Sequence, residues 1–217
     1  MGSIDTMKLM GDAFVSLAER FPLEKISVSD IVAASGKNRK TFYYHFNDKS
    51  HLIRWIFRND LASLLQERFE GASLVYEESD EYAMPDLPYY TLKKTGIRSL
   101  DGSGFFCALA DTFQNRRAYY AKALRSNDPD GLRAYLLELY TPALEKDIRF
   151  ILSNRTLSES SIRFLAEFYA GAIVTYMANR LCSPAEHDIL SDIDPFGNIV
   201  HDSIEHMIKE QQFRRVL

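Results

Sequence analysis

The fold is decided between residues 26 and 49, which read ISVSDIVAASGKNRKTFYYHFNDK. Ser27 and Asp30 have the spacing of a hydroxyl helix cap followed by an acid three residues later, so a short helix is predicted there. Gly36 ends it, since glycine adopts the left-handed conformation at little cost. Aromatic residues from Arg39 to Phe46 would also suit a strand. The position of this run between the glycine turn and the Asn47-Asp48 cap predicts a second short helix instead.

A longer helix is predicted on either side of this pair. The segment from Asp5 to Phe21 carries apolar residues at three-four spacing, and Pro22 ends it. The segment from Lys49 to Glu70 carries a second apolar stripe. Two short helices joined by a glycine turn after a longer helix form the helix-turn-helix plan of DNA-binding heads.

The rest of the chain also reads mostly as helix. Residues 71–104 are the least regular part, with Pro85 and Pro88, and we expect one helix there from Tyr89 to Leu100. No strand alternation stands out. Further helices are predicted at Phe105–Gln114, Arg116–Ser126, Asp130–Ser153, Glu159–Cys182 and Pro195–Gln211. The sequence therefore predicts an all-α protein of about nine helices, with a helix-turn-helix head at residues 1–48 and a helical body for ligand binding and dimerisation at residues 49–217.

Composition excludes several classes of protein. With 46% hydrophobic and 26% charged residues, the 217-residue chain has the composition of a folded globular protein. No apolar run reaches the roughly 18 residues that a membrane span needs, so we expect a cytoplasmic protein without a membrane partner. The two cysteines, Cys107 and Cys182, offer no zinc spacing, and we expect no metal and no cofactor. Neither a glycine-rich phosphate loop nor a nucleophile elbow occurs, so we expect that the protein is not an enzyme.

Charge is unevenly distributed along the chain. The net charge is -4, yet the stretch from Lys37 to Arg58 holds six basic residues and one acidic residue, which leaves +5. The remainder of the chain then carries -9. A basic head on an acidic body is typical of a protein that meets phosphates at one end only.

The second short helix carries the chemistry expected for reading DNA. Phe42 and Phe46 lie four residues apart and can face the core. Arg39 and Lys40 suit guanine edges or phosphates, and the Tyr43 hydroxyl suits phosphates, as does the Lys49 amine. Tyr44 and His45 could read bases or simply belong to a solvated face. The candidate DNA-contacting residues are Ser27, Ser29, Lys37, Asn38, Arg39, Lys40, Thr41, Tyr43, Tyr44, His45 and Lys49.

This head resembles the TetR family of transcriptional regulators. The opening from Ile26 to Ile31, and the run from Thr41 to Lys49 followed by Leu52, match the family's helix-turn-helix in order and spacing. One departure is Ser35-Gly36-Lys37, where the family usually has alanine-glycine-valine. The form from Asn38 to Asp48 resembles the branch that includes dihydroxyacetone kinase regulators. The competing interpretation is a small helical bundle with incidental basic residues.

The resemblance implies a homodimer that pairs through the last two long helices and reads a palindromic operator in double-stranded DNA. Two-fold symmetry would place the recognition helices about 34–36 Å apart. Apolar stripes on both long helices fit this expectation, although each could equally be ordinary core. The candidate interface residues are Leu165, Tyr169, Ala172, Ile173, Tyr176, Ile199, Val200, Ile204, Met207 and Ile208.

The resemblance also implies a pocket for a small-molecule effector in the body, whose identity the sequence leaves unknown. Tyrosine and phenylalanine offer apolar walls, and tyrosine adds a polar tip, but the same residues could simply build the core. The candidate pocket residues are Tyr89, Phe105, Phe106, Phe113, Tyr120, Phe168 and Tyr169. We expect a repressor that a small molecule releases from DNA. The alternative is a DNA-binding coactivator controlled by a protein partner.

Overall fold

The computed structural model describes residues 2–78, 84–91, 93–94, 100–126, 128–155, 157–183 and 206–207. Within these ranges the chain forms eight α-helices, and His206 and Met207 are also helical. The predicted all-α fold is therefore confirmed. The remainder of the helix expected at Pro195–Gln211 lies outside the described residues.

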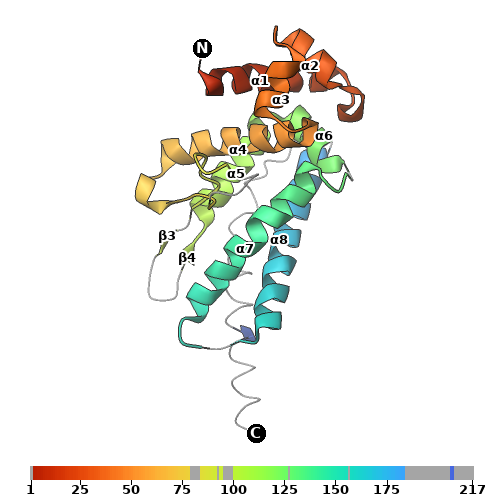
Figure 1. Cartoon of the computed structure of the whole chain (residues 1–217). Helices are drawn as coiled ribbons and strands as arrows, with labels where there is room; N and C mark the ends of the chain where they lie inside the picture. Colours follow the sequence, from red (N-terminus) through yellow and green to blue (C-terminus); the bar gives the residue numbers. More distant parts are fainter. Residues whose placement is uncertain are drawn as a thin grey trace.

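The head consists of α1 (Ser3–Arg20), α2 (Val28–Ala34) and α3 (Arg39–His45), with a 3-10 turn η1 (Leu23–Lys25) between the first two. Figure 1 shows the head stacked on one side of α4 (Lys49–Arg68). The predicted cap of α2 is confirmed, since the Ser27 amide donates to Asp30 over 2.8 Å and the Asp30 amide donates back to the Ser27 hydroxyl. Gly36 takes a φ of 65°, as the turn requires.

The core of the head forms where the helices cross. Phe14, Ile31, Phe42 and Phe46 are all fully or almost fully buried, which confirms the predicted inward face of α3. Gly11 on α1 lies directly against α4, where an added Cβ would meet Ile56 at 3.2 Å and Trp55 at 3.4 Å. A larger residue at position 11 would push α1 away from α4.

The segment between α4 and the body contains short strands instead of the helix expected at Tyr89–Leu100, so that prediction was wrong. After η2 (Gly71–Ser73), β1 (Leu74–Val75) pairs antiparallel with β2 (Tyr90–Thr91), and β3 (Lys93–Lys94) pairs with β4 (Leu100–Asp101). The aromatic and β-branched residues of β2 suit an extended backbone, and β1 supplies a hydrogen-bonding edge from a distant part of the sequence. Single-sequence periodicity cannot detect such a pairing.

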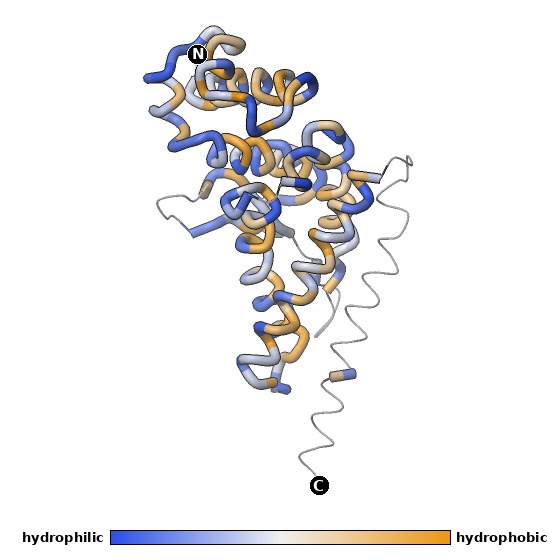
Figure 2. Tube along the Cα trace, turned by 90° about the vertical axis from the view of Figure 1, so that its right-hand side faces the viewer, coloured by the Kyte–Doolittle hydropathy of each residue, from blue (hydrophilic) through white to orange (hydrophobic). Residues whose placement is uncertain are grey.

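The body is formed by α5 (Ser103–Asn115), α6 (Arg117–Arg125), α7 (Leu132–Leu152) and α8 (Glu159–Cys182). In Figure 1, α7 and α8 run side by side and extend away from the head. Apolar residues gather where these helices face each other, as the hydropathy colouring in Figure 2 shows. One core cluster spans the head, α4 and most of the body, and a smaller one joins the far ends of α7 and α8.

Helix α6 fastens the head to the body. The Lys122 ammonium donates to the carbonyls of Ala18, Glu19 and Phe21 at the carboxyl end of α1. A cation at this end satisfies carbonyls that have no partner within the helix. Nearby, the buried rings of Phe14 and Tyr119 meet edge to face with centroids 6.0 Å apart. The head therefore packs against both α4 and α6.

Candidate nucleic-acid interface

Helix α3 is short, and its first turn is fixed by Asn38. The Asn38 side-chain oxygen accepts hydrogen bonds from the Thr41 amide at 2.9 Å and from the Thr41 hydroxyl at 3.1 Å. This is an N-cap, which costs about 1 kcal/mol to remove. The sequence interpretation assigned Asn38 and Thr41 to DNA contact only. The pattern of an asparagine three residues before a threonine could have revealed the cap.

The outer face of α3 is open to solvent while its inner face is the core. On the outer face, Tyr44 is 81% exposed and Tyr43 is 53% exposed. Phe42, on the inner face, is fully buried. Arg39 and Lys40 are exposed at the amino-terminal end of the helix. A helix that buries one aromatic edge and presents aromatic and basic side chains on the other has the form that enters a major groove.

The neighbouring candidate residues surround this face. Ser29 is exposed on α2, and the Ser27 hydroxyl donates to Asp30 over 2.6 Å, which lowers the pKa of Asp30 below its ordinary value. His45 is half-buried at the end of α3, where its Nδ1 lies 3.5 Å from the Ser3 hydroxyl. Partial burial lowers the pKa of His45 below its ordinary value. Its protonated form is therefore disfavoured relative to that of a free histidine.

Lys49 has a different place from the one expected. Its ammonium donates to the carbonyls of Leu23 at 2.8 Å and Ile26 at 3.1 Å, so it joins the start of α4 to the linker between α1 and α2. A side chain held in this way is not directed at a phosphate. The amino end of α4 itself, capped by Asp48, still presents backbone amides. The phosphate contact expected of the Lys49 amine is thus replaced by contacts within the head.

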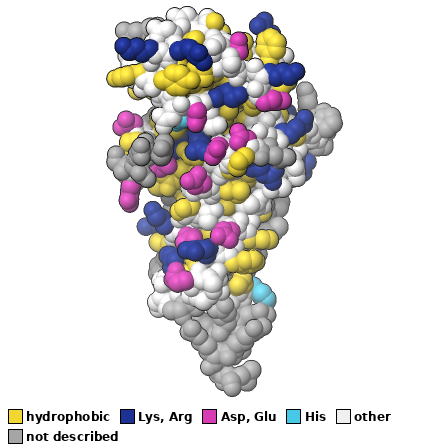
Figure 3. Space-filling model, turned by 45° about the vertical axis from the view of Figure 1, so that its right-hand side comes forward, with side chains coloured by type: hydrophobic (Ala, Val, Ile, Leu, Met, Phe, Trp, Pro, Cys, Tyr) yellow, Lys and Arg dark blue, Asp and Glu magenta, His cyan; other side chains and the backbone are white. Residues whose placement is uncertain are grey.

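Surface charge follows the pattern predicted from the sequence. On the face in Figure 3, Lys and Arg side chains gather over the head, and acidic side chains lie mainly over the body below it. The Arg39 and Lys40 side chains belong to the exposed part of the head. Of the basic segment from Lys37 to Arg58, Arg39 and Lys40 are thus presented on α3, whereas Lys49 and Arg58 are turned inward.

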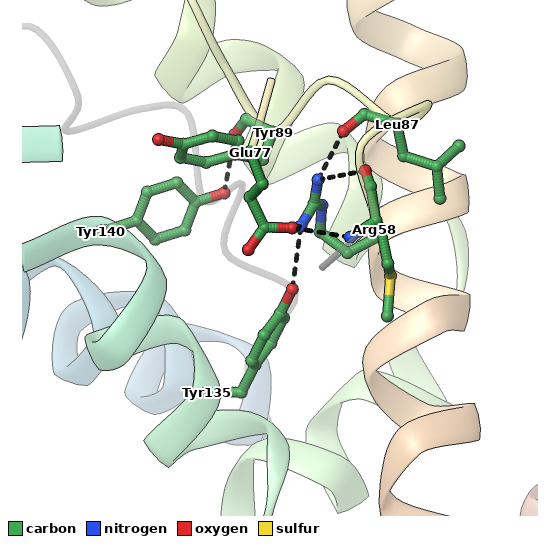
Figure 4. A network of polar contacts seen from close by, with 7 residues as sticks. Arg58, Glu77, Leu87, Tyr89, Tyr135 and Tyr140 are labelled. Atoms are coloured by element: carbon green, nitrogen blue, oxygen red, sulfur yellow. Dashed lines mark hydrogen bonds and ion pairs between the residues drawn. The ribbon is translucent and has the colours of Figure 1, made fainter. Parts of the chain in front are cut away.

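Behind the interface, α4 contains a fully buried arginine that the sequence interpretation counted only as a basic residue. The Arg58 guanidinium pairs with Glu77, donates to the Tyr135 hydroxyl at 3.0 Å and to the carbonyls of Met84 and Leu87 (Figure 4). Its charged carbon also lies 5.2 Å from the centre of the Tyr89 ring. Position 58 falls on the apolar stripe of α4, three residues before Leu61. A basic residue at such a position could have indicated from the sequence that Arg58 is buried.

The body contains an open cavity of about 670 Å³ between η2, β1, β2 and α7. Tyr89 is the one candidate pocket residue that lines it. Phe105, Phe113 and Tyr120 are packed in the core, and Phe106 is partly buried beside it. Phe168 is 56% exposed, and Tyr169 belongs to the smaller cluster between α7 and α8. The aromatic residues chosen from the sequence thus mostly build the interior.

The candidate dimer residues on α8 are divided between two faces. Leu165, Tyr169 and Ile173 are buried within the chain's own core, because α8 turns this stripe toward α7. Ala172 and Tyr176 are half-buried. Met207 packs against the smaller core cluster, and Ile199, Val200, Ile204 and Ile208 lie outside the described residues. The exposed apolar residues of α8 are Phe164 and Phe168, whose rings stack with centroids 6.2 Å apart.

The described residues contain neither a metal-binding cluster nor a membrane-crossing helix. Within the described ranges, no group of three or more His, Cys, Asp or Glu side chains is arranged to hold a metal ion. In the same part of the chain, no helix is both long and apolar enough to cross a membrane.

Comparison with known proteins agrees with this architecture. Residues 12–55 match the family described as bacterial regulatory proteins of the TetR family, and residues 103–183 match a transcriptional regulator C-terminal region of TetR type. The head is similar to the transcriptional activator DhaS of the dhaKLM operon in Lactococcus lactis subsp. lactis (strain IL1403), with 40% identity over 65 residues. That match covers 30% of this chain and about a third (35%) of the relative.

Solved structures extend the likeness to the whole fold. A dihydroxyacetone kinase operon activator DhaS shares a TM-score of 0.54 at 20% identity, over 93% of this chain and 97% of that one. A TetR regulator from Streptococcus agalactiae 2603V gives 0.54 at 18%, over 91% and 94%. The fatty acid degradation regulator FadR from Bacillus halodurans gives 0.56 at 15%, over 90% and 94%. With a TetR-type head and a TetR-type body that together match more than half of its residues, the chain belongs to the TetR family of DNA-binding transcriptional regulators, and its head is similar to that of DhaS.

Proposed function

We propose that this protein is a dimeric repressor that reads a palindromic operator with α3 and is released from DNA by a small molecule bound in its body. The observation that carries the DNA-reading role is the exposure of Tyr43 and Tyr44 beside the basic amino end of α3, above a buried Phe42. Arg39 and Lys40 supply base-edge or phosphate contacts. The Tyr43 hydroxyl contacts a phosphate, which fixes the register.

Dimerisation is proposed through α8, on a face different from the one first inferred. Phe164 and Phe168 form a stacked apolar pair that is more than half exposed. Gly171 follows at helical spacing, and a Cβ there would meet nothing within 4 Å. An exposed aromatic pair beside an open glycine suits close packing against a second helix. Two-fold pairing here would make the same α8 face of both copies the interface.

The DNA-binding proposal is tested by selecting from a random pool of duplex DNA with the purified protein at several salt concentrations. We expect a palindrome, with an affinity that falls steeply as salt increases because phosphate contacts release counterions. Arg39→Ala and Tyr43→Ala should each weaken binding to the selected duplex about 5- to 100-fold. Arg125→Ala, which removes an exposed arginine of the body, is the control and should bind as wild type. Recovery of no motif by a folded dimer would overturn the proposal.

An activator controlled by a partner protein is the second candidate. It is favoured by the L. lactis relative, which is named as an activator and shares 40% identity with the head. The sign of regulation is measured with a reporter gene placed behind the selected operator. Lower expression with the protein present supports the repressor, and higher expression supports the activator.

A further inference from the structure

The cavity in the body is bounded by elements on two sides. Ala72, Ser73, Leu74 and Val75 form one wall, and Ala143, Asp147 and Phe150 of α7 form another. Tyr89 and Tyr90 of the β2 segment lie between these walls. A volume of about 670 Å³ falls within the usual size of small-molecule sites. Most of the lining side chains are aliphatic or aromatic, so the cavity favours an apolar ligand body.

The lining of this cavity also contains two lysines and one aspartate. Lys94 and Lys146 are both exposed, and the Lys94 ammonium lies 4.7 Å from the centre of the Phe150 ring. The one acidic residue of the lining, Asp147, already accepts a hydrogen bond from the Tyr90 hydroxyl at 2.5 Å. Within the described residues, neither lysine forms an ion pair with a carboxylate, so both ammonium groups can meet an anion, and that of Lys94 lies beside an apolar ring.

We propose that this cavity binds an amphipathic carboxylate, with its apolar part between β1 and α7 and its carboxylate between Lys94 and Lys146. This inference rests on the proposed function, because it supplies the effector class for the released repressor. The two lysines fix the orientation of the ligand through charge-assisted hydrogen bonds. The aliphatic and aromatic walls supply most of the affinity through burial of apolar surface.

The position of the cavity explains how occupancy reaches the DNA-binding head. Tyr89 lines the cavity, and the Arg58 guanidinium lies 5.2 Å from the centre of its ring. The Tyr89 carbonyl also accepts from the Tyr140 hydroxyl of α7 at 3.2 Å (Figure 4). Arg58 belongs to α4, whose first turn directly follows α3. A ligand that displaces Tyr89 therefore acts on the helix that carries the recognition helix.

The test uses the full-length protein with 1-anilinonaphthalene-8-sulfonate as a fluorescent amphipathic anion, displaced by decanoate or by the neutral decanol. We expect decanoate to displace the dye more strongly than decanol. Lys146→Glu should weaken decanoate binding up to about fivefold, the limit for an exposed charge pair, and leave decanol unchanged. Arg125→Glu, the same charge change on another exposed helix position, should alter neither. Ala143→Leu fills the cavity and should weaken both ligands.

The same protein preparations are titrated onto the selected duplex with and without decanoate. We expect saturating decanoate to lower the affinity for DNA at least about fivefold, as coupling between two sites requires. Equal displacement by decanoate and decanol, or no effect of Lys146→Glu, would overturn the anion assignment. Unchanged binding in a folded Ala143→Leu would overturn the cavity as the site. If the protein binds the selected duplex and decanoate does not change that affinity, the carboxylate inference fails and the proposed DNA-binding function stands. If decanoate binds the cavity and no duplex is selected, the proposed DNA-binding function fails.

Discussion

Arg116, at the junction of α5 and α6, donates a hydrogen bond over 2.9 Å to Asp12 of α1, a residue 104 positions earlier in the chain. The same guanidinium lies 3.3 Å from Asp60 of α4, and Asp60 accepts a hydrogen bond from the Tyr120 hydroxyl at 2.7 Å. One arginine thus joins the head, α4 and α6. The two carboxylates differ in exposure, since the Asp12 side chain is 63% exposed and that of Asp60 16%.

This difference predicts unequal effects of breaking the two ion pairs. Arg116→Ala leaves Asp60 in a site whose burial already raises its pKa, and should destabilise the fold by about 1–3 kcal/mol. Asp12→Asn removes only the exposed pair and should cost less than about 1 kcal/mol. Urea unfolding of both variants measures the difference. Equal losses would contradict the bridging role of Arg116 at Asp60.

Removing the buried arginine of α4 should cost much more. Arg58→Met leaves Glu77, the Tyr135 hydroxyl and two carbonyls without the cation that they surround, and should destabilise the protein by about 3–5 kcal/mol. Arg68→Met makes the same change on the same helix at a partly exposed pair with Asp111 and should cost less than about 1 kcal/mol. Chemical denaturation compares the two. A small loss for Arg58→Met would mean that the network does not hold α4 to the body.

The head was predictable because its signals are local. Caps such as Ser27 and Asp48, the glycine turn at Gly36 and the spacing of Phe42 and Phe46 all act within a few residues. Each of them indicates where a helix starts, where it ends or which of its sides is buried. The family likeness therefore rests on positions whose physical roles could be assigned one by one.

The body was less predictable because its decisive contacts join distant residues. The pairing of β1 with β2, the inward turn of the Lys49 amine and the burial of Arg58 depend on partners between 15 and 77 positions away. Aromatic content indicated where apolar mass lies, but not whether a given ring lines a cavity or fills the core. The same limit explains why Leu165 and Tyr169 were assigned to an interface and lie in the chain's own core.

Two aromatic residues of α3 should separate folding from DNA recognition. Phe42 is fully buried, so Phe42→Ala should destabilise the head by about 3–5 kcal/mol. Tyr44 is 81% exposed, so Tyr44→Ala should change stability by less than about 0.5 kcal/mol and weaken binding to the selected duplex. Thermal unfolding and DNA titration are measured on both. A Tyr44→Ala variant with wild-type DNA affinity would assign that ring to a solvated face.

The proposed dimer face on α8 predicts the outcome of placing a charge there. Phe168→Glu should shift the protein toward monomer in sedimentation velocity, because a carboxylate cannot be buried in the interface without a partner. Phe21→Glu is the matched control, since Phe21 is also about half exposed but lies at the end of α1. It should leave the assembly unchanged. A stable Phe168→Glu dimer would place the interface on another face.

Asp147 predicts a specific dependence of stability on pH. Burial raises its pKa from an ordinary value of 3.8 to about 6, and the Tyr90 hydrogen bond opposes that rise. Tyr89, Tyr90, Lys94 and Lys146 are the other titratable groups that line the same cavity. Because the folded protein holds this proton more tightly than the unfolded chain, the contribution of Asp147 is present in full below pH 3.8 and is lost as pH rises through about 6.

Asp147→Asn should therefore become steadily more stable relative to wild type between pH 4 and pH 8. The change is at most about 3 kcal/mol, because each pKa unit corresponds to about 1.4 kcal/mol. The amide oxygen of asparagine can still accept from the Tyr90 hydroxyl, so the substitution removes the charge without emptying the site. Asp86→Asn makes the same change at an exposed position and should alter stability by less than about 0.5 kcal/mol at either pH. A difference between Asp147→Asn and wild type that stays constant from pH 4 to pH 8 would show that the ionised carboxylate is not disfavoured in the fold, and that its charge reaches water or one of the two lysines.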